Sequence, residues 1–314
     1  MSDIRKVLLD CDPGIDDALA IALAIGDPAI DLRAITTVGG NVGLQLTTEN
    51  ALRLREYFNA DVPISAGSAA PLIRNVEDAS HVHGVGGLGG AVLPASTLPV
   101  DPRHAAQLII DTLRNAPGEV HVVAIGPLTN IALAIRLEPR VVEWAASFVM
   151  MGGSFTRGNA TPAAEFNVFA DPEAARIVFG AGWQVTMIGL DVTHQARANS
   201  DVIARLAAMG DLGTELVVPA LTFYEDAASA DGQGPAVHDL CAVAYISHPE
   251  FFTAVPAAVD VETSGRLSYG MTVVDFDPPL PNANVPTGID KPAFWDYVVA
   301  SYATHFTATG RVGQ

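Results

Sequence analysis

Four aspartates within eight residues are the strongest chemical signal in the sequence: Asp10, Asp12, Asp16 and Asp17. They follow a short apolar run and open an apolar helical pattern. Partly buried carboxylates about 4 Å apart repel by roughly 4 kcal/mol per pair at an effective dielectric constant of about 20, so a positive group is expected among them. A hard divalent cation fits, because carboxylate oxygens are its preferred ligands. The alternative is a helix N-cap, with Asp10 and Asp12 solvated in a loop.

A second candidate pair, His238-Asp239, precedes the apolar helical run 240–246, so both residues should lie in the first turn of a helix. A carboxylate there could join a metal site, and a histidine can act as an acid near neutral pH. Taken alone, such a pair is more often an N-cap beside an ordinary surface histidine. The adjacent cysteines, Cys11 and Cys241, are expected to be small buried residues rather than metal ligands.

Amide and carboxylate side chains also follow two of the predicted strands. Asn41 comes after Val38-Gly39-Gly40, while Asn159, Glu165 and Asn167 lie in a loop after Met150-Met151. Such side chains offer both donors and acceptors, which suits them to bind hydroxyl groups. A polar loop without function would look similar.

The segment 84–89 matches the pattern G-x-G-x-x-G, but a dinucleotide fingerprint needs a strand before it and a helix after it. No clear strand precedes this segment, and Pro94 and Pro99 disfavour a following helix. We predict a flexible loop whose first histidines, His81 and His83, can swing over a substrate; both could equally be surface residues. The other histidines stand apart from candidate groups and are expected to be structural: His104, His121, His194, His248 and His305.

Short apolar or β-branched runs alternate with helical patterns through the first two thirds of the chain. Strands separated by single helices are typical of a parallel sheet covered on both faces. We therefore predict an α/β fold with a mostly parallel, open, Rossmann-like sheet whose ligands bind at the carboxyl ends of the strands. The predicted strands are 7–10, 32–38, 62–66, 120–125, 148–151 and 185–190, and the helices are 16–25, 47–58, 102–115, 128–137 and 172–180.

The C-terminal third looks like an elaboration of this fold, mostly helical over 200–247 and with short strands over 255–288. No linker of Gly/Ser-rich or charge-rich composition separates it from the rest. We predict a single domain over 1–314.

Composition narrows the partners. The chain carries 17 basic and 35 acidic residues, a formal charge of −18, which argues against binding to nucleic acid or to an anionic membrane surface. Only two lysines and two cysteines are present, so P-loop chemistry, a disulfide framework and a four-cysteine zinc site have almost no candidates. With no signal-peptide pattern at the N-terminus, we expect a cytoplasmic protein that acts on small molecules.

Taken together, the motifs resemble the nucleoside hydrolases of the inosine–uridine-preferring family. The matching segments are DCDPGIDDALAI from Asp10, VGGN ending at Asn41, GPLTN after Ile125, MGGS from Met151, the GN and AEFN pieces of 158–167, and His238-Asp239. They occur in family order across most of the chain. The resemblance implies calcium-dependent hydrolysis of the N-glycosidic bond of ribonucleosides to free base and ribose.

The resemblance also implies roles for individual residues. Asp12, Asp17, Asp239 and the backbone carbonyl of Ile125 would hold Ca²⁺; Asp12 would also take a proton from the attacking water, and His238 would protonate the leaving base. Asp10 would support this cluster. The substrate-binding residues would be Asp16, Asn41, His83, Met151, Asn159, Glu165, Phe166, Asn167 and Asp239.

Two other functions are compatible with the residues. Asp10-Cys11-Asp12 after an apolar strand also resembles the nucleophile motif of haloacid-dehalogenase-like phosphatases, although Pro13-Gly14 replaces the expected pair and the usual lysine has no counterpart. A nucleoside- or ribose-binding protein without turnover would keep the same pocket. The resemblance alone suggests a homodimer or homotetramer, and the preferred base stays open.

Overall fold

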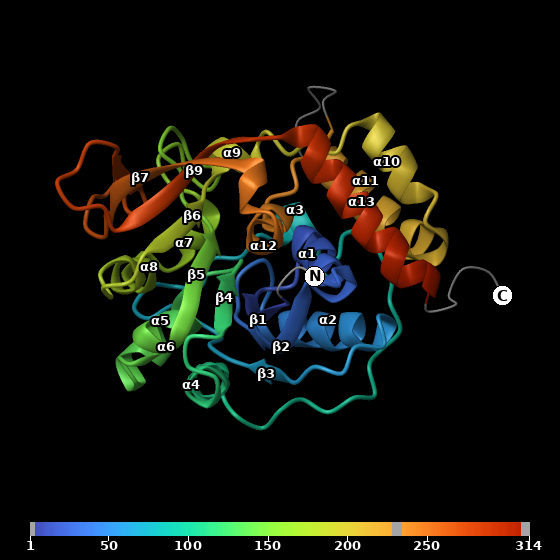
Figure 1. Ribbon diagram of the computed structural model, residues 1–314, viewed down its shortest axis with the longest axis horizontal. Helices are drawn as coiled ribbons and strands as arrows, with labels where there is room; N and C mark the ends of the chain where they lie inside the picture. Colours follow the sequence, from blue (N-terminus) through green and yellow to red (C-terminus); the bar gives the residue numbers. More distant parts are fainter. Residues whose placement is uncertain (1–3, 228–233, 309–314) are drawn as a thin grey trace.

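The computed structural model describes residues 4–227 and 234–308. Its described strands form one nine-stranded sheet in the order β3-β2-β1-β4-β5-β6-β9-β7-β8 (Figure 1). The strands are β1 (Arg5–Cys11), β2 (Ile30–Thr37), β3 (Ile64–Ala66), β4 (Val120–Ala124), β5 (Ala145–Met151), β6 (Val185–Ile188), β7 (Phe252–Val261), β8 (Thr272–Asp275) and β9 (Ala283–Ile289). The first six strands pair in parallel, which confirms the predicted α/β class.

The centre of the sheet contains a change in the direction of winding. From β1 the chain proceeds outward through β2 and β3, then crosses back so that β4 pairs with the other edge of β1. Loops leave β1 and β4 in opposite directions at such a point and open a crevice at the carboxyl ends of the strands. The segment from Asp10 to Asp17 begins in β1 at this crevice, and Ile125 follows β4 directly.

Helices cover both faces of the sheet because the central strands are apolar on both sides. On β1, Val7 and Leu9 pack into one layer and Leu8 packs into the other. The first layer contains α1 (Ile15–Gly26), α2 (Leu44–Tyr57), α12 (Asp239–Ser247) and α13 (Lys291–Ala308). The second contains α4 (Ala105–Asn115), α5 (Thr129–Leu137) and α8 (Pro172–Phe179).

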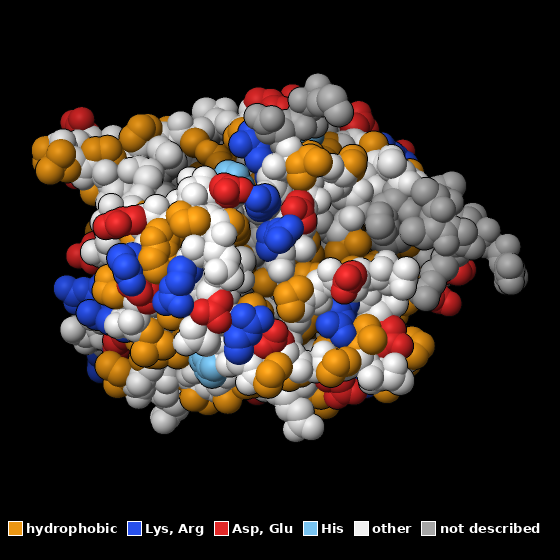
Figure 2. Space-filling view, turned by 60° about the horizontal axis from the view of Figure 1, so that its bottom comes forward, with side chains coloured by type: hydrophobic (Ala, Val, Ile, Leu, Met, Phe, Trp, Pro, Cys, Tyr) orange, Lys and Arg blue, Asp and Glu red, His pale blue; other side chains and the backbone are white. Residues whose placement is uncertain are grey.

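The remaining helices are short or lie beside the first layer: α3 (Ser80–His83), α6 (Val141–Trp144), α7 (Phe166–Ala170), α9 (Leu190–Thr193), α10 (Ser200–Ala207), the π-helical segment η1 (Leu212–Val217), α11 (Val218–Ala227) and the 3₁₀ turn η2 (Pro249–Phe251). No described helix combines the length and the low polarity needed to cross a bilayer. Figure 2 shows a face on which basic and acidic side chains lie side by side, and arginines form ion pairs such as Arg103–Asp101 at 2.7 Å.

Several predicted boundaries were wrong. The strand expected over 185–190 ends at Ile188, and Leu190 begins α9. Helix α4 starts at Ala105 rather than at residue 102, because the side chain of His104 caps it by accepting from the Ala106 N–H. The largest omission is α13, whose Phe294, Val298 and Tyr302 are buried against the first layer.

The C-terminal strands were predicted correctly as a group. Strand β9 pairs in parallel with β6, and β7 pairs antiparallel with both β9 and β8. They extend the same sheet, so the elaborated C-terminal portion is continuous with the α/β part. The single-domain prediction itself stays an expectation.

Candidate active site

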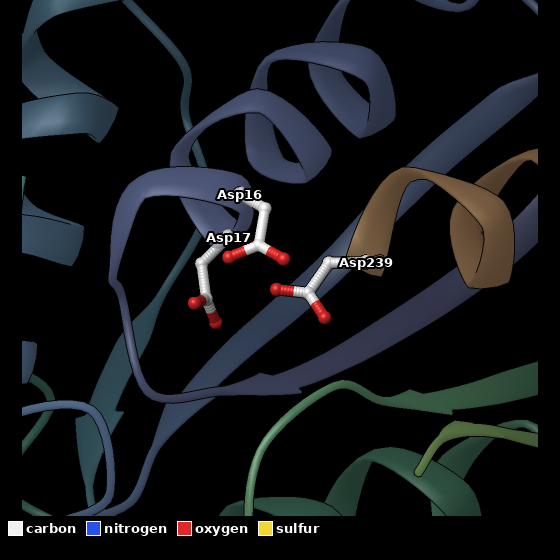
Figure 3. Close-up of side chains that lie close together, drawn as sticks. All are labelled: Asp16, Asp17 and Asp239. Carbon is white, nitrogen blue, oxygen red and sulfur yellow. The ribbon is translucent and has the colours of Figure 1, made fainter. Parts of the chain in front are cut away.

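Three buried carboxylates meet at the winding change of the sheet. Asp16 and Asp17 come from the first turn of α1, and Asp239 is the first residue of α12. One carboxylate oxygen from each lies within 4.8 Å of the others, and Figure 3 shows the side chains pointing toward one another. The three are at most 4% exposed. We call these residues, together with Asp12, the acidic floor.

Asp12 lies beside this group, and hydrogen bonds link it to Asp17 and to Asn41. Its own N–H donates to Oδ1 of Asp17 at 3.1 Å, and the Asn41 N–H donates to Oδ2 of Asp12 at 2.7 Å. The side-chain amide of Asn41 donates to Oδ2 of Asp17 at 2.9 Å. Oδ1 of Asp12 is buried and has no hydrogen-bond partner among the described residues. The floor therefore contains a carboxylate oxygen that is desolvated and still able to bind a ligand.

The electrostatics of the acidic floor require a proton or a cation. Burial, and then the neighbouring carboxylates, raise the pKa of Asp12 and Asp239 well above the ordinary range, and burial raises the pKa of Asp17 to about 7. One carboxylate oxygen of Asp17 lies within 4.8 Å of one of Asp239, so the two charges repel unless they share a proton or a cation. A divalent cation could replace that proton, because it satisfies several carboxylates at once. The residues thus fit a metal ion.

Asp10 is fully buried near the carboxyl end of β1. Its Oδ1 accepts from Thr36 Oγ1 at 2.6 Å and from Asn130 Nδ2 at 2.9 Å, so it ties β1 to β2 and α5. The cysteines beside the site are fully buried, and burial raises the pKa of both thiols. Each thiol donates to a backbone carbonyl, as expected for packing residues.

A cavity of about 370 Å³ opens above the acidic floor. That volume is at the lower end of the range of small-molecule sites. Every residue for which we predicted substrate contact lines this cavity: Asp16, Asn41, His83, Met151, Asn159, Glu165, Phe166, Asn167 and Asp239. Ile125 and His238 line it as well, whereas Asp12 and Asp17 do not reach its surface.

Glu165 and Asn167 join the loop after β5 to the ends of two strands. Glu165 caps α7 and accepts from the N–H groups of Gly153 (2.8 Å) and Asn167 (2.8 Å). The side-chain amide of Asn167 donates to the carbonyls of Ile125 (2.9 Å) and Met151 (3.1 Å). Burial raises the pKa of Glu165 to about 7. These bonds fix the polar edge of the cavity, and the exposed Asn159 lies at its rim.

Histidines from three separate elements form one side of the cavity: His83 of α3, His194 after α9, and His238 before α12. We call them the histidine wall. Nδ1 of His238 is 2.7 Å from the Thr193 hydroxyl, and its ring meets the His194 ring edge to face at 5.5 Å. Burial lowers the pKa of His238 well below the usual range, so its ring is neutral at pH 7 rather than an acid poised near neutrality.

Two expectations about histidines were wrong. His81 and His83 do not begin a swinging loop, because both lie in α3: the exposed His81 lines the cavity, while His83 ends the helix, is 6% exposed and accepts from the Ile15 N–H. His194, expected to stand apart, lies in the cavity wall. The side chain of His305 falls outside the described residues. The segment 84–89 is a loop, as predicted.

Other cavity residues were not predicted individually from the sequence. Tyr224 of α11 lines the cavity 5.7 Å from the His83 ring, and Glu77, Asp78 and Phe169 contribute to the lining. Tyr224 lies in the helical segment 222–226, where the family resemblance implies base contacts without assigning them to single residues.

Comparisons with known proteins agree with this geometry. The family model for inosine-uridine preferring nucleoside hydrolase matches residues 7–296. The inosine-uridine preferring nucleoside hydrolase of Leishmania major is 47% identical over 94% of this chain and 96% of its own length, and the non-specific ribonucleoside hydrolase RihC of Salmonella newport is 42% identical over 96% and 99%. A solved purine-preferring ribonucleoside hydrolase from Gardnerella vaginalis superposes with a TM-score of 0.91 at 29% identity, over 97% of this chain and 100% of that one. The chain belongs to the inosine-uridine preferring nucleoside hydrolase family of enzymes.

Proposed function

We propose that this enzyme hydrolyses the N-glycosidic bond of ribonucleosides to free base and ribose, with Ca²⁺ as its metal. The observation that carries the proposal is the cavity itself, in which hydroxyl-binding amides and carboxylates stand directly over four buried aspartates. Family membership supports the reaction class, and two of the relatives are named for inosine and uridine or for ribonucleosides in general. The family assignment leaves no support for the phosphatase alternative.

Asp12, Asp17, Asp239 and the Ile125 carbonyl are the proposed metal ligands, and the compact grouping of Asp16 with Asp17 and Asp239 puts a fourth carboxylate within reach. When bound, Ca²⁺ would offset the charge of the acidic floor and lower the pKa of a nearby water. Oδ1 of Asp12 has no hydrogen-bond partner in the described part of the chain, so it is the proposed acceptor of the proton that this water gives up. Asp10 would support this cluster through its hydrogen bonds to Thr36 and Asn130.

Ribose binding is proposed for the polar edge of the cavity. Asp16, Asn41, Asn159, Glu165, Asn167 and Asp239 would hold the sugar hydroxyls, and Met151 and Phe166 would pack against it. As the C1′–N bond breaks, positive charge develops on the ribose, and the buried carboxylates stabilise it. The water oxygen bonds to C1′ while the bonding electron pair leaves with the base.

His238 is the proposed proton donor to the departing base. The Thr193 hydroxyl can donate to Nδ1 of the neutral ring or accept from Nδ1–H of the charged ring, so this hydrogen bond survives either protonation state. Protonation therefore costs the ring no hydrogen bond, but because burial lowers its pKa the ring is neutral at pH 7 and must take up a proton before it can give one to the base. His83 would contact the bound nucleoside.

The direct test is ribose release from inosine, uridine, cytidine and adenosine, measured with calcium and after chelation. The proposal expects release from at least one nucleoside that depends on the metal, and the panel also identifies the preferred base. Tight binding of a ribose analogue with no product from any nucleoside would favour a binding protein instead. A homodimer or homotetramer and a cytoplasmic location stay predictions, the first of which light scattering would check.

A further inference from the structure

His83 makes an unusual contact with the helix that carries the acidic floor. Its Nδ1 accepts a hydrogen bond from the Ile15 N–H at 3.0 Å. Ile15 is the first residue of α1, and its N-cap, Gly14, has no side chain to satisfy the free N–H groups of the first turn. Asp16 and Asp17 follow immediately. A histidine 68 residues away in sequence therefore caps the helix end from which both carboxylates project.

The surroundings show that this contact is built into the fold. A Cβ at Gly14 would lie 2.5 Å from Nδ1 of His83 and 2.7 Å from the side-chain amide of Asn41, so only glycine leaves room for them. The short helix α3 is tied to the same place, because the Ala79 N–H donates to the Asn41 carbonyl at 3.1 Å. The ring is thus held in one position against α1.

This contact settles which nitrogen carries the proton. A backbone N–H can only donate, so Nδ1 must present its lone pair, and the neutral ring carries its hydrogen on Nε2. Nε2 makes no hydrogen bond to the described residues, and the ring lines the cavity. Protonating Nδ1 would set two donors against each other. His238 differs, because its partner is the Thr193 hydroxyl, which can either donate or accept the hydrogen bond.

We propose that His83 is a fixed hydrogen-bond donor and a positioning residue at once: Nδ1 caps α1 and holds the acidic floor in place, while Nε2–H binds an acceptor atom of the nucleoside and never transfers its proton. The donor role rests on the proposed function, whereas the cap and the tautomer do not. His83 would therefore favour substrates that present an oxygen or nitrogen lone pair at this point of the cavity.

The tautomer can be observed directly in the full-length protein with ¹⁵N-labelled histidine. Two-bond proton–nitrogen spectra distinguish the two neutral forms of each imidazole, and the signal lost in His83→Asn identifies residue 83. We expect the Nε2–H form, unchanged on adding Ca²⁺ alone. The Nδ1–H form, or a ring that exchanges between both forms, would overturn the proposal.

Two substitutions separate the two nitrogens. In His83→Asn the amide oxygen can take the place of Nδ1 and keep the cap, whereas in His83→Gln the longer amide reaches the place of Nε2 and leaves Ile15 uncapped. A lost cap costs about 1 kcal/mol, so calorimetry should show about five-fold weaker Ca²⁺ binding for His83→Gln and little change for His83→Asn. At saturating Ca²⁺, kcat/KM should fall about ten-fold in His83→Asn and less in His83→Gln.

His104 provides a matched control. Its Nδ1 caps α4 by accepting from the Ala106 N–H at 3.2 Å, and His104 is not part of the cavity lining. His104→Gln should lower the unfolding temperature without changing Ca²⁺ affinity or kcat/KM. Equal Ca²⁺ affinities of the two His83 variants would refute the cap, and normal kcat/KM in His83→Asn would refute the donor. If the unsubstituted protein hydrolyses no nucleoside or binds no Ca²⁺, the proposed function fails, but the tautomer and the unfolding temperatures of the metal-free variants still decide the cap.

Discussion

The acidic floor and the histidine wall face the same cavity but are built in different ways. The floor comes mainly from one continuous segment between β1 and α1, with Asp239 added from α12. The wall collects single residues from α3, the end of α9 and the start of α12. The floor lies where the sheet changes its direction of winding, so its position follows from the fold. The position of the wall depends instead on the ends of α3 and α9 and on the start of α12.

The two regions also differ in their chemistry. The carboxylates of the floor are crowded and desolvated, and the pKa of each is raised. The wall is the reverse, since burial lowers the pKa of its histidines and leaves them neutral. A nucleoside between them would have its ribose near negative charge and its base near neutral donors. That division matches a reaction in which the sugar becomes positive and the base leaves with an electron pair.

The largest effect is expected from the floor. Asp12→Asn keeps the side-chain shape and can still accept from the Asn41 N–H, but it cannot take a proton from water. We expect kcat to fall about 10³-fold, within the range for loss of a general base. The half-buried Asp31, paired with Arg33, gives a control in Asp31→Asn with normal turnover. A decrease of less than ten-fold in Asp12→Asn would remove this residue from the chemistry.

Removing the metal should disable the floor and leave the wall folded. Chelation should lower kcat about 100-fold or more, and added Ca²⁺ should restore it. Calcium at about 100 times its dissociation constant should also stabilise the fold by about 2.7 kcal/mol, seen as a higher unfolding temperature. Activity and unfolding temperature that both ignore the chelator would show that the acidic floor works without a metal.

A smaller effect is expected from the wall. Thr193→Val removes the hydroxyl beside Nδ1 of His238 but keeps the shape of this fully buried side chain. We expect kcat to fall about ten-fold with little change in KM, because an unpaired buried nitrogen costs about 1–2 kcal/mol and the ring loses its orientation. Thr193→Ser should recover most of the activity. If serine and valine behave alike, the hydroxyl does not position His238.

The smallest expected effect is on stability. Burial raises the pKa of Asp10, Asp17 and Glu165 to about 7, so the metal-free folded state binds more protons than the unfolded chain between about pH 4 and 7. Its free energy of unfolding should therefore decrease as the pH rises through this range, by about 1 kcal/mol or more. Denaturant titrations after chelation measure this slope, and Ca²⁺ should flatten it. Stability that rises with pH in the chelated protein would contradict the assignment.

The floor and the wall also differ in how well they could be predicted from the sequence. The floor was predictable because crowded carboxylates after an apolar strand have few physical explanations, and alternating patterns placed that strand in a parallel sheet. His194 was missed because a lone histidine has the same local pattern whether it meets a ligand or the core. The contact between His83 and Ile15 joins residues 68 positions apart, and no local pattern encodes it.

The same limit explains the errors in the fold. Helix α13 was overlooked because it follows strands with many prolines, and its buried positions become evident only once α1 lies against it. The strands of the parallel core were found because each is a short apolar run that alternates with a helical pattern along the chain. Local pattern was thus sufficient for the core and insufficient wherever distant segments meet.

The most direct test of the account is a crystal structure of the protein grown with Ca²⁺, in which anomalous scattering locates the ion. The account predicts one ion at the acidic floor, about 2.3–2.6 Å from carboxylate oxygens of Asp12, Asp17 and Asp239. The Ile125 carbonyl should complete the protein ligands. An ion bound away from these residues would contradict it, and so would crystals that hydrolyse a nucleoside with no ion at the floor.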